Sequence, residues 1–185
     1  GVTQIAGDEF HSLFLKSDGS LHAMGLNNRG QLGTGDTTNK HSPTQVVASG
    51  VIQIATGRYH SLFLKSDGSL HAMGWNEHGE LGDGTTTQPS APIEIISSGV
   101  TQIATGGRFS LFLKSNGSLW GMGTNANERL GLASSDSHKS TPQLIVASGV
   151  ESVSVGSLHT LFVKSDGSLW GFGSNSYGRL GNGSD

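Results

Sequence analysis

The sequence predicts an all-β protein, a β-propeller built from about four repeats of about 49 residues, each folded as a four-stranded blade. Three observations lead to this fold class: a four-fold internal repeat, a turn sequence at the same place in every repeat, and a strand that is apolar on both of its sides. No long stretch shows helical periodicity without a glycine break. The chain would then form a partial ring, or one half of a ring that a second chain completes.

The repeat is visible in the pair Gly-Val, which returns at intervals of 49, 49 and 50 residues from Gly1, through Gly50 and Gly99, to Gly149. It divides the chain, taken as a single domain over residues 1–185, into units 1–49, 50–98, 99–148 and an incomplete unit 149–185. The one inserted residue of the third unit falls between Gly131 and Pro142, which predicts a surface loop there.

Each unit contains short apolar segments, which we predict to be strands. In unit one these are residues 2–6, 12–16, 21–25 and 45–48, and the last is matched by residues 93–96 and 143–146. Asp18-Gly19 separates the second and third segments, and Asp-Gly or Asn-Gly recurs there in every unit. Such a pair between apolar strands predicts a tight hairpin with a type I′ turn.

The second strand predicts how the sheets pack. Leu13 and Leu15 lie on one side of this strand and Phe14 on the other, and all three positions are apolar in every unit. A strand with one face in water would alternate apolar and polar residues, so this strand should be buried on both faces. Small sheets that cover one another on both faces are the blades of a propeller.

The composition excludes several classes of protein. The net charge is only −3 and charged residues make up 14% of the chain, which argues against a nucleic-acid partner or a membrane-surface module. Zero cysteine excludes disulfides, zinc fingers and thiol catalysis. No apolar run is long enough for a transmembrane helix and no signal peptide is visible, so we expect no membrane segment. The compartment stays open; the repeats look bacterial, and secretion is one option.

The repeats also carry a family resemblance. The pattern is clearest in unit two, which contains Gln53-Ile54-Ala55, Gly57, His60-Ser61-Leu62, Asp67-Gly68, Gly74, Asn76, Gly79 and Leu81-Gly82. It strongly resembles the regulator of chromosome condensation repeat family, over essentially the whole chain. The resemblance implies a propeller, usually of seven blades closed by pairing of the two chain ends. Unit three departs from the pattern at Phe109 and Glu128.

Histidine recurs at the start of the second strand, at His11, His60 and His159, where three imidazoles could surround a metal ion. We favour a structural role instead, a hydrogen bond that ties the loops of the histidine's own blade, because Phe109 stands here in unit three. The asparagine after each third strand, Asn27 in unit one, is predicted to brace a loop. No nucleotide, calcium or hydrolase motif is found, so we expect no cofactor, no metal and no enzymatic activity.

The loops between strands differ most from unit to unit, and variable loops on a rigid scaffold are typical of binding proteins. We therefore predict a non-enzymatic scaffold that binds a partner protein, of unknown identity, through these loops. A carbohydrate or cell-surface binding module and a self-assembling structural propeller are the alternatives. The candidate contact residues are Phe10, Arg29, Arg58, Tyr59, Trp75, His78, Arg108 and Tyr177.

An open arc of four units would expose an apolar face at each end, and the incomplete fourth unit would leave an unpaired strand edge. Three arrangements would cover them: two copies that close one ring of about eight blades, a longer propeller of which this chain is a part, or a tight four-bladed ring. The sequence favours the first two equally, and the first predicts a homo-oligomer.

Overall fold

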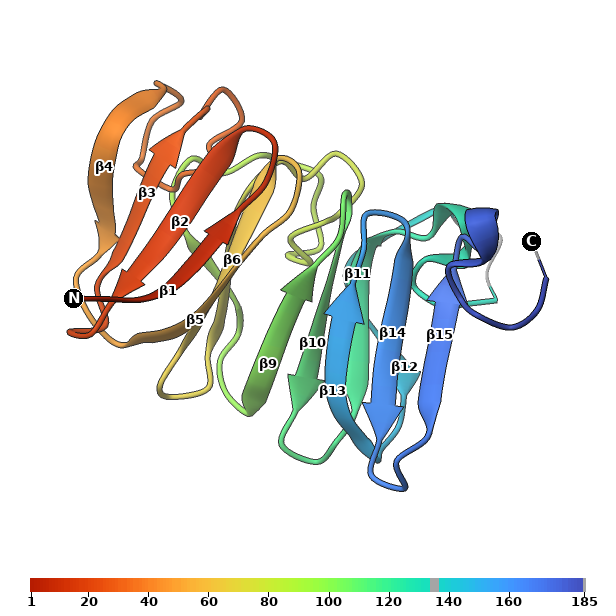
Figure 1. Ribbon diagram of the computed structural model, residues 1–185. Helices are drawn as coiled ribbons and strands as arrows, with labels where there is room; N and C mark the ends of the chain where they lie inside the picture. Colours follow the sequence, from red (N-terminus) through yellow and green to blue (C-terminus); the bar gives the residue numbers. More distant parts are fainter. Residues whose placement is uncertain (134–136, 185) are drawn as a thin grey trace.

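The computed structural model describes residues 1–133 and 137–184, which form four antiparallel β-sheets arranged in an arc (Figure 1). We call these sheets blades one to four. The first three are four-stranded, with the strands in sequence order across the sheet, and the fourth has three described strands. The predicted all-β blade architecture is confirmed, and the described residues do not close a ring.

Blade one consists of β1 (Val2–Gly7), β2 (His11–Lys16), β3 (Leu21–Gly25) and β4 (Lys40–Val47), and blade two of β5 (Val51–Thr56), β6 (His60–Lys65), β7 (Leu70–Gly74) and β8 (Ile93–Ile96). Blade three consists of β9 (Val100–Thr105), β10 (Phe109–Lys114), β11 (Leu119–Thr124) and β12 (His138–Val146), and blade four of β13 (Val150–Val155), β14 (His159–Lys164) and β15 (Leu169–Gly173). The described helices are the short 3-10 turns η1 (Ala126–Glu128) and η2 (Ser176–Gly178), neither of which could span a bilayer.

Two fourth strands begin earlier than predicted. β4 starts at Lys40 and β12 at His138, so that Pro43 and Pro142 lie inside strands rather than before them. A proline is tolerated there because the fourth strand is the edge of its blade, where an amide proton is not needed for pairing. The loop predicted around the inserted residue includes residues 134–136, which lie outside the described residues.

The Asp-Gly hairpin differs in detail from the predicted type I′ turn. The Lys16 amide donates to the Ser20 carbonyl (3.0 Å), so residues 17–19 form a three-residue loop. Gly19 has a φ of 77°, whereas Asp18 is not in the positive-φ region. Asp18 accepts hydrogen bonds from the amide and hydroxyl of Ser20 instead, at 2.9 and 2.6 Å. The type I′ prediction was wrong because a turn of this length needs only its last residue in the left-handed region.

The hydrophobic core lies between the blades. The second strands of the inner blades, β6 and β10, are buried on both faces, as predicted. Phe63 of blade two packs with Leu13 and Leu15 of blade one, and Phe112 and Phe162 occupy the same position at the next two interfaces. Along β2 and β14, buried residues alternate with partly exposed ones, because no described blade covers the outer sides of these strands.

Polar side chains also join neighbouring blades. On the first strand of blade two, the Gln53 amide group donates to the Ile103 carbonyl (3.3 Å) and accepts from the Ile103 amide (3.1 Å). Gln102 makes the same pair of bonds to Val153 of blade four. The glutamine side chain thus replaces the backbone of a neighbouring strand at a place where the two first strands do not pair directly.

His11 and His60 bond to the following blade, which the prediction that each histidine ties its own blade did not include; His11 Nδ1 also lies 3.3 Å from Asp8 Oδ2 in the loop of its own blade. His11 Nε2 lies 2.8 Å from Ser61 Oγ, and His60 Nε2 lies 2.9 Å from Ser110 Oγ, in each case in the following blade. Their partners lie 50 residues away because blades pack face to face across this position. Phe109 keeps the site filled and fully buried in blade three.

Candidate binding surface

The variable loops gather at one end of the blades. Because neighbouring strands are antiparallel, the turns between first and second strands and the loops after third strands lie at the same end, and the Asp-Gly turns lie at the other (Figure 1). The loop after β3 is held by Asn27, whose side chain donates to the Asp36 carbonyl (2.9 Å) and accepts from the Leu32 amide (3.0 Å). This confirms the predicted bracing role of the asparagine.

Three aromatic side chains from two blades stack in a row at this end. The Phe10 and Tyr59 rings are nearly parallel, with centroids 5.1 Å apart, and the Trp75 ring lies 5.1 Å beyond Tyr59. The two loops of blade two that carry Tyr59 and Trp75 are joined, because the Trp75 amide donates to the Tyr59 carbonyl (2.9 Å). Backbone and ring contacts therefore both fix this pair, and Phe10 joins the row through its ring contact with Tyr59.

Cationic side chains cover the aromatic row. The guanidinium carbon of Arg29 lies 4.3 Å from the centroid of the Trp75 ring, and that of Arg108 lies 5.9 Å from it. Arg58 lies 5.5 Å from the centroid of the Tyr59 ring. Arg108 also contacts His78, with 3.1 Å between Nη1 and Nε2. We call the seven connected residues the aromatic–arginine surface; they are Phe10, Arg29, Arg58, Tyr59, Trp75, His78 and Arg108.

Tyr177 is the one candidate that lies apart from this surface. It belongs to the last blade and is 94% exposed, and in the part of the chain that the structure describes its ring interacts only with Arg179, whose guanidinium carbon lies 5.8 Å from the ring centroid. Sequence reasoning missed His138, whose ring lies 6.3 Å from that of His78, and missed Arg129, described below. Both fall in the third unit, whose loop differs most from the other units.

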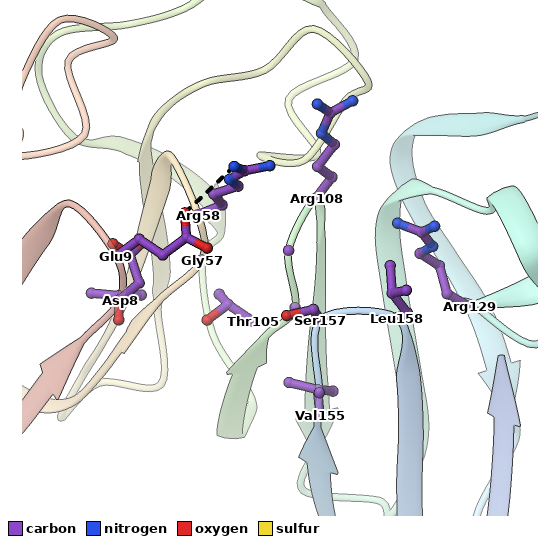
Figure 2. Close-up of a pocket in the computed structure, with 14 residues that line it drawn as sticks. Asp8, Glu9, Gly57, Arg58, Thr105, Arg108, Arg129, Val155, Ser157 and Leu158 are labelled. Carbon is purple, nitrogen blue, oxygen red and sulfur yellow. Dashed lines mark ion pairs between the residues drawn. The ribbon is translucent and has the colours of Figure 1, made fainter. Parts of the chain in front are cut away.

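A pocket of about 470 Å³ opens beside the aromatic–arginine surface, between the turns that join first and second strands (Figure 2). The glycines of these turns are required by close packing, since a Cβ on Gly57 would overlap the His60 ring and one on Gly106 the Phe109 ring. Unit one has Asp8 at this position instead. The charged residues of the lining are Asp8, Glu9, Arg58, Arg108 and Arg129.

The acidic groups of the pocket come from blade one. Burial by itself would raise the pKa of Asp8, but hydrogen bonds from His11 and from the Phe10 amide hold this pKa below its usual value. Glu9 is close to a cation, because its Oε2 lies 3.4 Å from Arg58 Nη2. The carboxylates and Arg58 therefore form a partly neutralised side of the pocket.

Arg129 is the most buried cation of the pocket. It is only 8% exposed, and its Nε donates to the Ala126 carbonyl (2.8 Å). Burial and, after it, the nearby Arg108 lower the pKa of Arg129. Within residues 1–133 and 137–184, neither arginine forms an ion pair with a carboxylate.

A buried carboxyl lies under the surface loops. Glu80 is 1% exposed, and its Oε2 accepts a hydrogen bond from the His78 amide (2.8 Å). Burial raises the pKa of Glu80 to about 7. The same position in unit one holds Gln31, whose Oε1 accepts from the Arg29 amide at 2.8 Å.

Sequence profiles of the regulator of chromosome condensation (RCC1) repeat match residues 18–64, 67–113 and 116–163, and a second profile matches residues 2–31, 51–80, 100–128 and 150–179. The chain belongs to the RCC1 repeat family. The resemblance inferred from the repeats is thereby confirmed. No group of three or more potential metal-ligating side chains is found among the described residues of this RCC1-repeat chain.

Solved structures of similar fold include Prp20p from Saccharomyces cerevisiae, with 23% identity, a TM-score of 0.86 and coverage of 100% of this chain and 48% of that one. Human WBSCR16 is 26% identical, with a TM-score of 0.83 and coverage of 93% and 47%. The chain thus spans about half the length of these proteins. A shorter match of 46 residues, 50% identical, covers 24% of this chain and 4% of the probable E3 ubiquitin-protein ligase HERC4 of Rattus norvegicus.

Proposed function

We propose that this chain is a non-enzymatic β-propeller scaffold that binds a partner protein through the aromatic–arginine surface. One observation carries the proposal: side chains from the variable loops of three different blades contact one another in a single surface. Aromatic and arginine residues supply most of the binding energy at many protein interfaces. Their stacking here fixes them before binding, which lowers the entropic cost of association.

The relatives support a protein as partner. The structure of yeast Prp20p is described together with its binding to Gsp1p and histones, and another shows Kap60 bound to the same protein. The alternative of a sugar-binding module is less well supported. Sugars stack on free aromatic faces, whereas Tyr59 stands between two other rings and Trp75 is covered by Arg29.

Quantitative capture with cross-linking tests the proposal. The wild-type chain is compared with Tyr59→Ala and with the matched control Lys65→Ala, at the opposite end of blade two. We expect proteins that the wild type and the control capture equally and that Tyr59→Ala captures at least about tenfold less. Equal capture by all three folded chains would contradict the proposal, as would binding to a glycan array that is lost with Tyr59→Ala.

We further propose that a second copy covers the open ends of the arc. Ile5 of blade one is 78% exposed and Leu169 of blade four 68% exposed. Phe14 of blade one is equivalent to Phe63, which packs on the preceding blade. Leu161 and Val163 of blade four are equivalent to Leu13 and Leu15, which Phe63 contacts. The two ends therefore carry the two halves of the contact that the inner blades make. Light scattering across a dilution series should give about twice the 19.2 kDa mass of one chain.

A further inference from the structure

We propose that the pocket of Figure 2 binds a single carboxylate, an aspartate or glutamate side chain presented by the partner protein, between Arg108 and Arg129. This inference rests on the proposed function and adds the chemistry by which the partner is recognised. It is based on the burial of one arginine, the fixed position of the other, the distribution of charge in the pocket and the comparison among repeats.

Arg129 is buried without an acidic partner among the described residues. Its terminal nitrogens reach the pocket, because neither of them is a buried atom without a partner. The burial of the rest of the side chain weakens the hydration of this cation, and an anion bound in the pocket would offset that loss. The Ala126 carbonyl uses one of its five N–H donors. A carboxylate would accept two more in the bidentate geometry that a guanidinium favours.

Arg108 is already ordered beside the pocket. His78 and the Trp75 ring hold its guanidinium at the edge where the pocket meets the aromatic–arginine surface. An ordered side chain loses little conformational entropy when a ligand binds. A partner that covers the aromatic–arginine surface would therefore bring its neighbouring residues directly to the two arginines.

The charge distribution favours one carboxylate over a polyanion. Figure 2 shows Asp8 and Glu9 at the left of the pocket, and Arg108 and Arg129 at its centre and right. A phosphate chain long enough to cross the pocket would meet these carboxylates, and like charges in contact weaken binding. A single carboxylate at the arginines would avoid that repulsion.

The repeats supply a matched control. The position of Arg129 is occupied by Gln31 in unit one, Glu80 in unit two and Arg179 in unit four. Arg179 makes the same local hydrogen bond as Arg129, from Nε to the Ser176 carbonyl at 2.8 Å, but it does not line the pocket. Since glutamine is accommodated in unit one, Arg129→Gln should fold, and Arg108→Gln changes an exposed side chain.

The experiment is a nuclear magnetic resonance titration of the full chain with the end-capped peptide Gly-Ser-Leu-Glu-Ser-Gly and with its twin, in which glutamine replaces glutamate. We expect the glutamate peptide to shift the arginine Nε–Hε signals of Arg108 and Arg129 and to bind at least about tenfold more tightly than its twin. Arg129→Gln and Arg108→Gln should each weaken binding about tenfold or more, and Arg179→Gln should leave it unchanged.

Equal binding of the two peptides, or an equal effect of Arg129→Gln and Arg179→Gln, would overturn the inference. Tighter binding of tripolyphosphate or of single-stranded DNA than of the glutamate peptide would overturn it as well, in favour of a phosphate site. The proposed function is judged separately. A captured partner that is lost with Tyr59→Ala but kept with both pocket variants would preserve the scaffold and refute the carboxylate site.

Discussion

At the scale of single residues, one repeat position decides which charge is buried beneath the loops. Gln31, Glu80 and Arg129 stand at this position in the first three units, and all three are at most 8% exposed. Burying a neutral amide there costs little free energy, whereas burial raises the pKa of the Glu80 carboxyl and lowers the pKa of the Arg129 guanidinium. The same local fold thus yields three electrostatic environments, according to which residue occupies this one repeat position.

Glu80→Gln should stabilise the protein at pH 8 by about 1–2 kcal/mol and give no gain at pH 5. The pKa of Glu80 rises from 4.5 in the unfolded chain to about 7, so the folded protein binds more protons between these values and loses stability as pH rises. This difference between the folded and unfolded pKa values corresponds to roughly 3 kcal/mol of stability at pH 8. The expected gain is smaller because the Nε2 of the new glutamine, like that of Gln31, would lack a hydrogen-bond partner.

Urea unfolding at the two pH values measures this effect. Gln31→Glu, the reverse change in unit one, is the control and should destabilise the protein more at pH 8 than at pH 5. A pH-independent difference between Glu80→Gln and the wild type would contradict the assignment.

His60→Phe should reduce the loss of stability in acid. Burial lowers the pKa of His60 from 6.5 to about 4, so the folded protein binds fewer protons than the unfolded chain between these values. Stability is therefore lost as pH falls from 6.5 towards 4, by up to roughly 3 kcal/mol. Phenylalanine fits this position in blade three, as Phe109 demonstrates. Thermal unfolding followed from pH 7 to pH 4 should show a shallower decline for the variant than for the wild type, and parallel curves would refute the explanation.

At the scale of strands and loops, the sequence predicted what depends on neighbours along the chain and missed what depends on the next blade. The place of the Asp18-Gly19 hairpin, though not its turn type, and the buried second strands were predictable because Asp-Gly turn signals and apolar patterning are local. The bond from His11 to Ser61 joins residues 50 positions apart, and no local pattern indicates its direction. The loop residues of the aromatic–arginine surface could be nominated from their variability. Arg129 also lies in a variable segment, but only the structure shows that it lines the pocket.

Gln53→Ala should destabilise the link between the first strands of blades two and three by about 1–3 kcal/mol, because it removes both hydrogen bonds to Ile103. Gln143→Ala is the control, since the Gln143 side chain bonds only to residues 141 and 142 of its own strand among the described residues. The control should change the free energy of unfolding by less than about 0.5 kcal/mol. Chemical denaturation measures the free energy of unfolding of both variants. Similar losses of stability in the two would show that the hydrogen bonds between Gln53 and Ile103 do not stabilise the contact between the blades.

At the scale of the whole molecule, the stacking of blades decides the fold and would also drive the proposed association of two copies. Each inner interface buries a phenylalanine of one blade against two aliphatic residues of the blade before it. Stability in such an array is the sum of blade and interface contributions, so an uncovered end blade lacks one interface. The incomplete burial of β2 and β14 is the direct sign of that missing interface.

Phe14→Asp and Phe63→Asp should separate association from folding. Phe63 is 1% exposed, and an aspartate there would place an unpaired carboxylate in the core, at a cost of several kcal/mol that should unfold or precipitate the chain. Phe14 is half-buried on the outer side of blade one, so an aspartate there should leave the chain folded and remove its contact with a second copy.

Circular dichroism and light scattering should therefore show a folded Phe14→Asp monomer of 19.2 kDa beside a wild-type dimer. A wild-type chain that stays monomeric at every concentration would refute the two-copy assembly, whereas a soluble, folded Phe63→Asp variant would refute the stacked core on which both predictions depend.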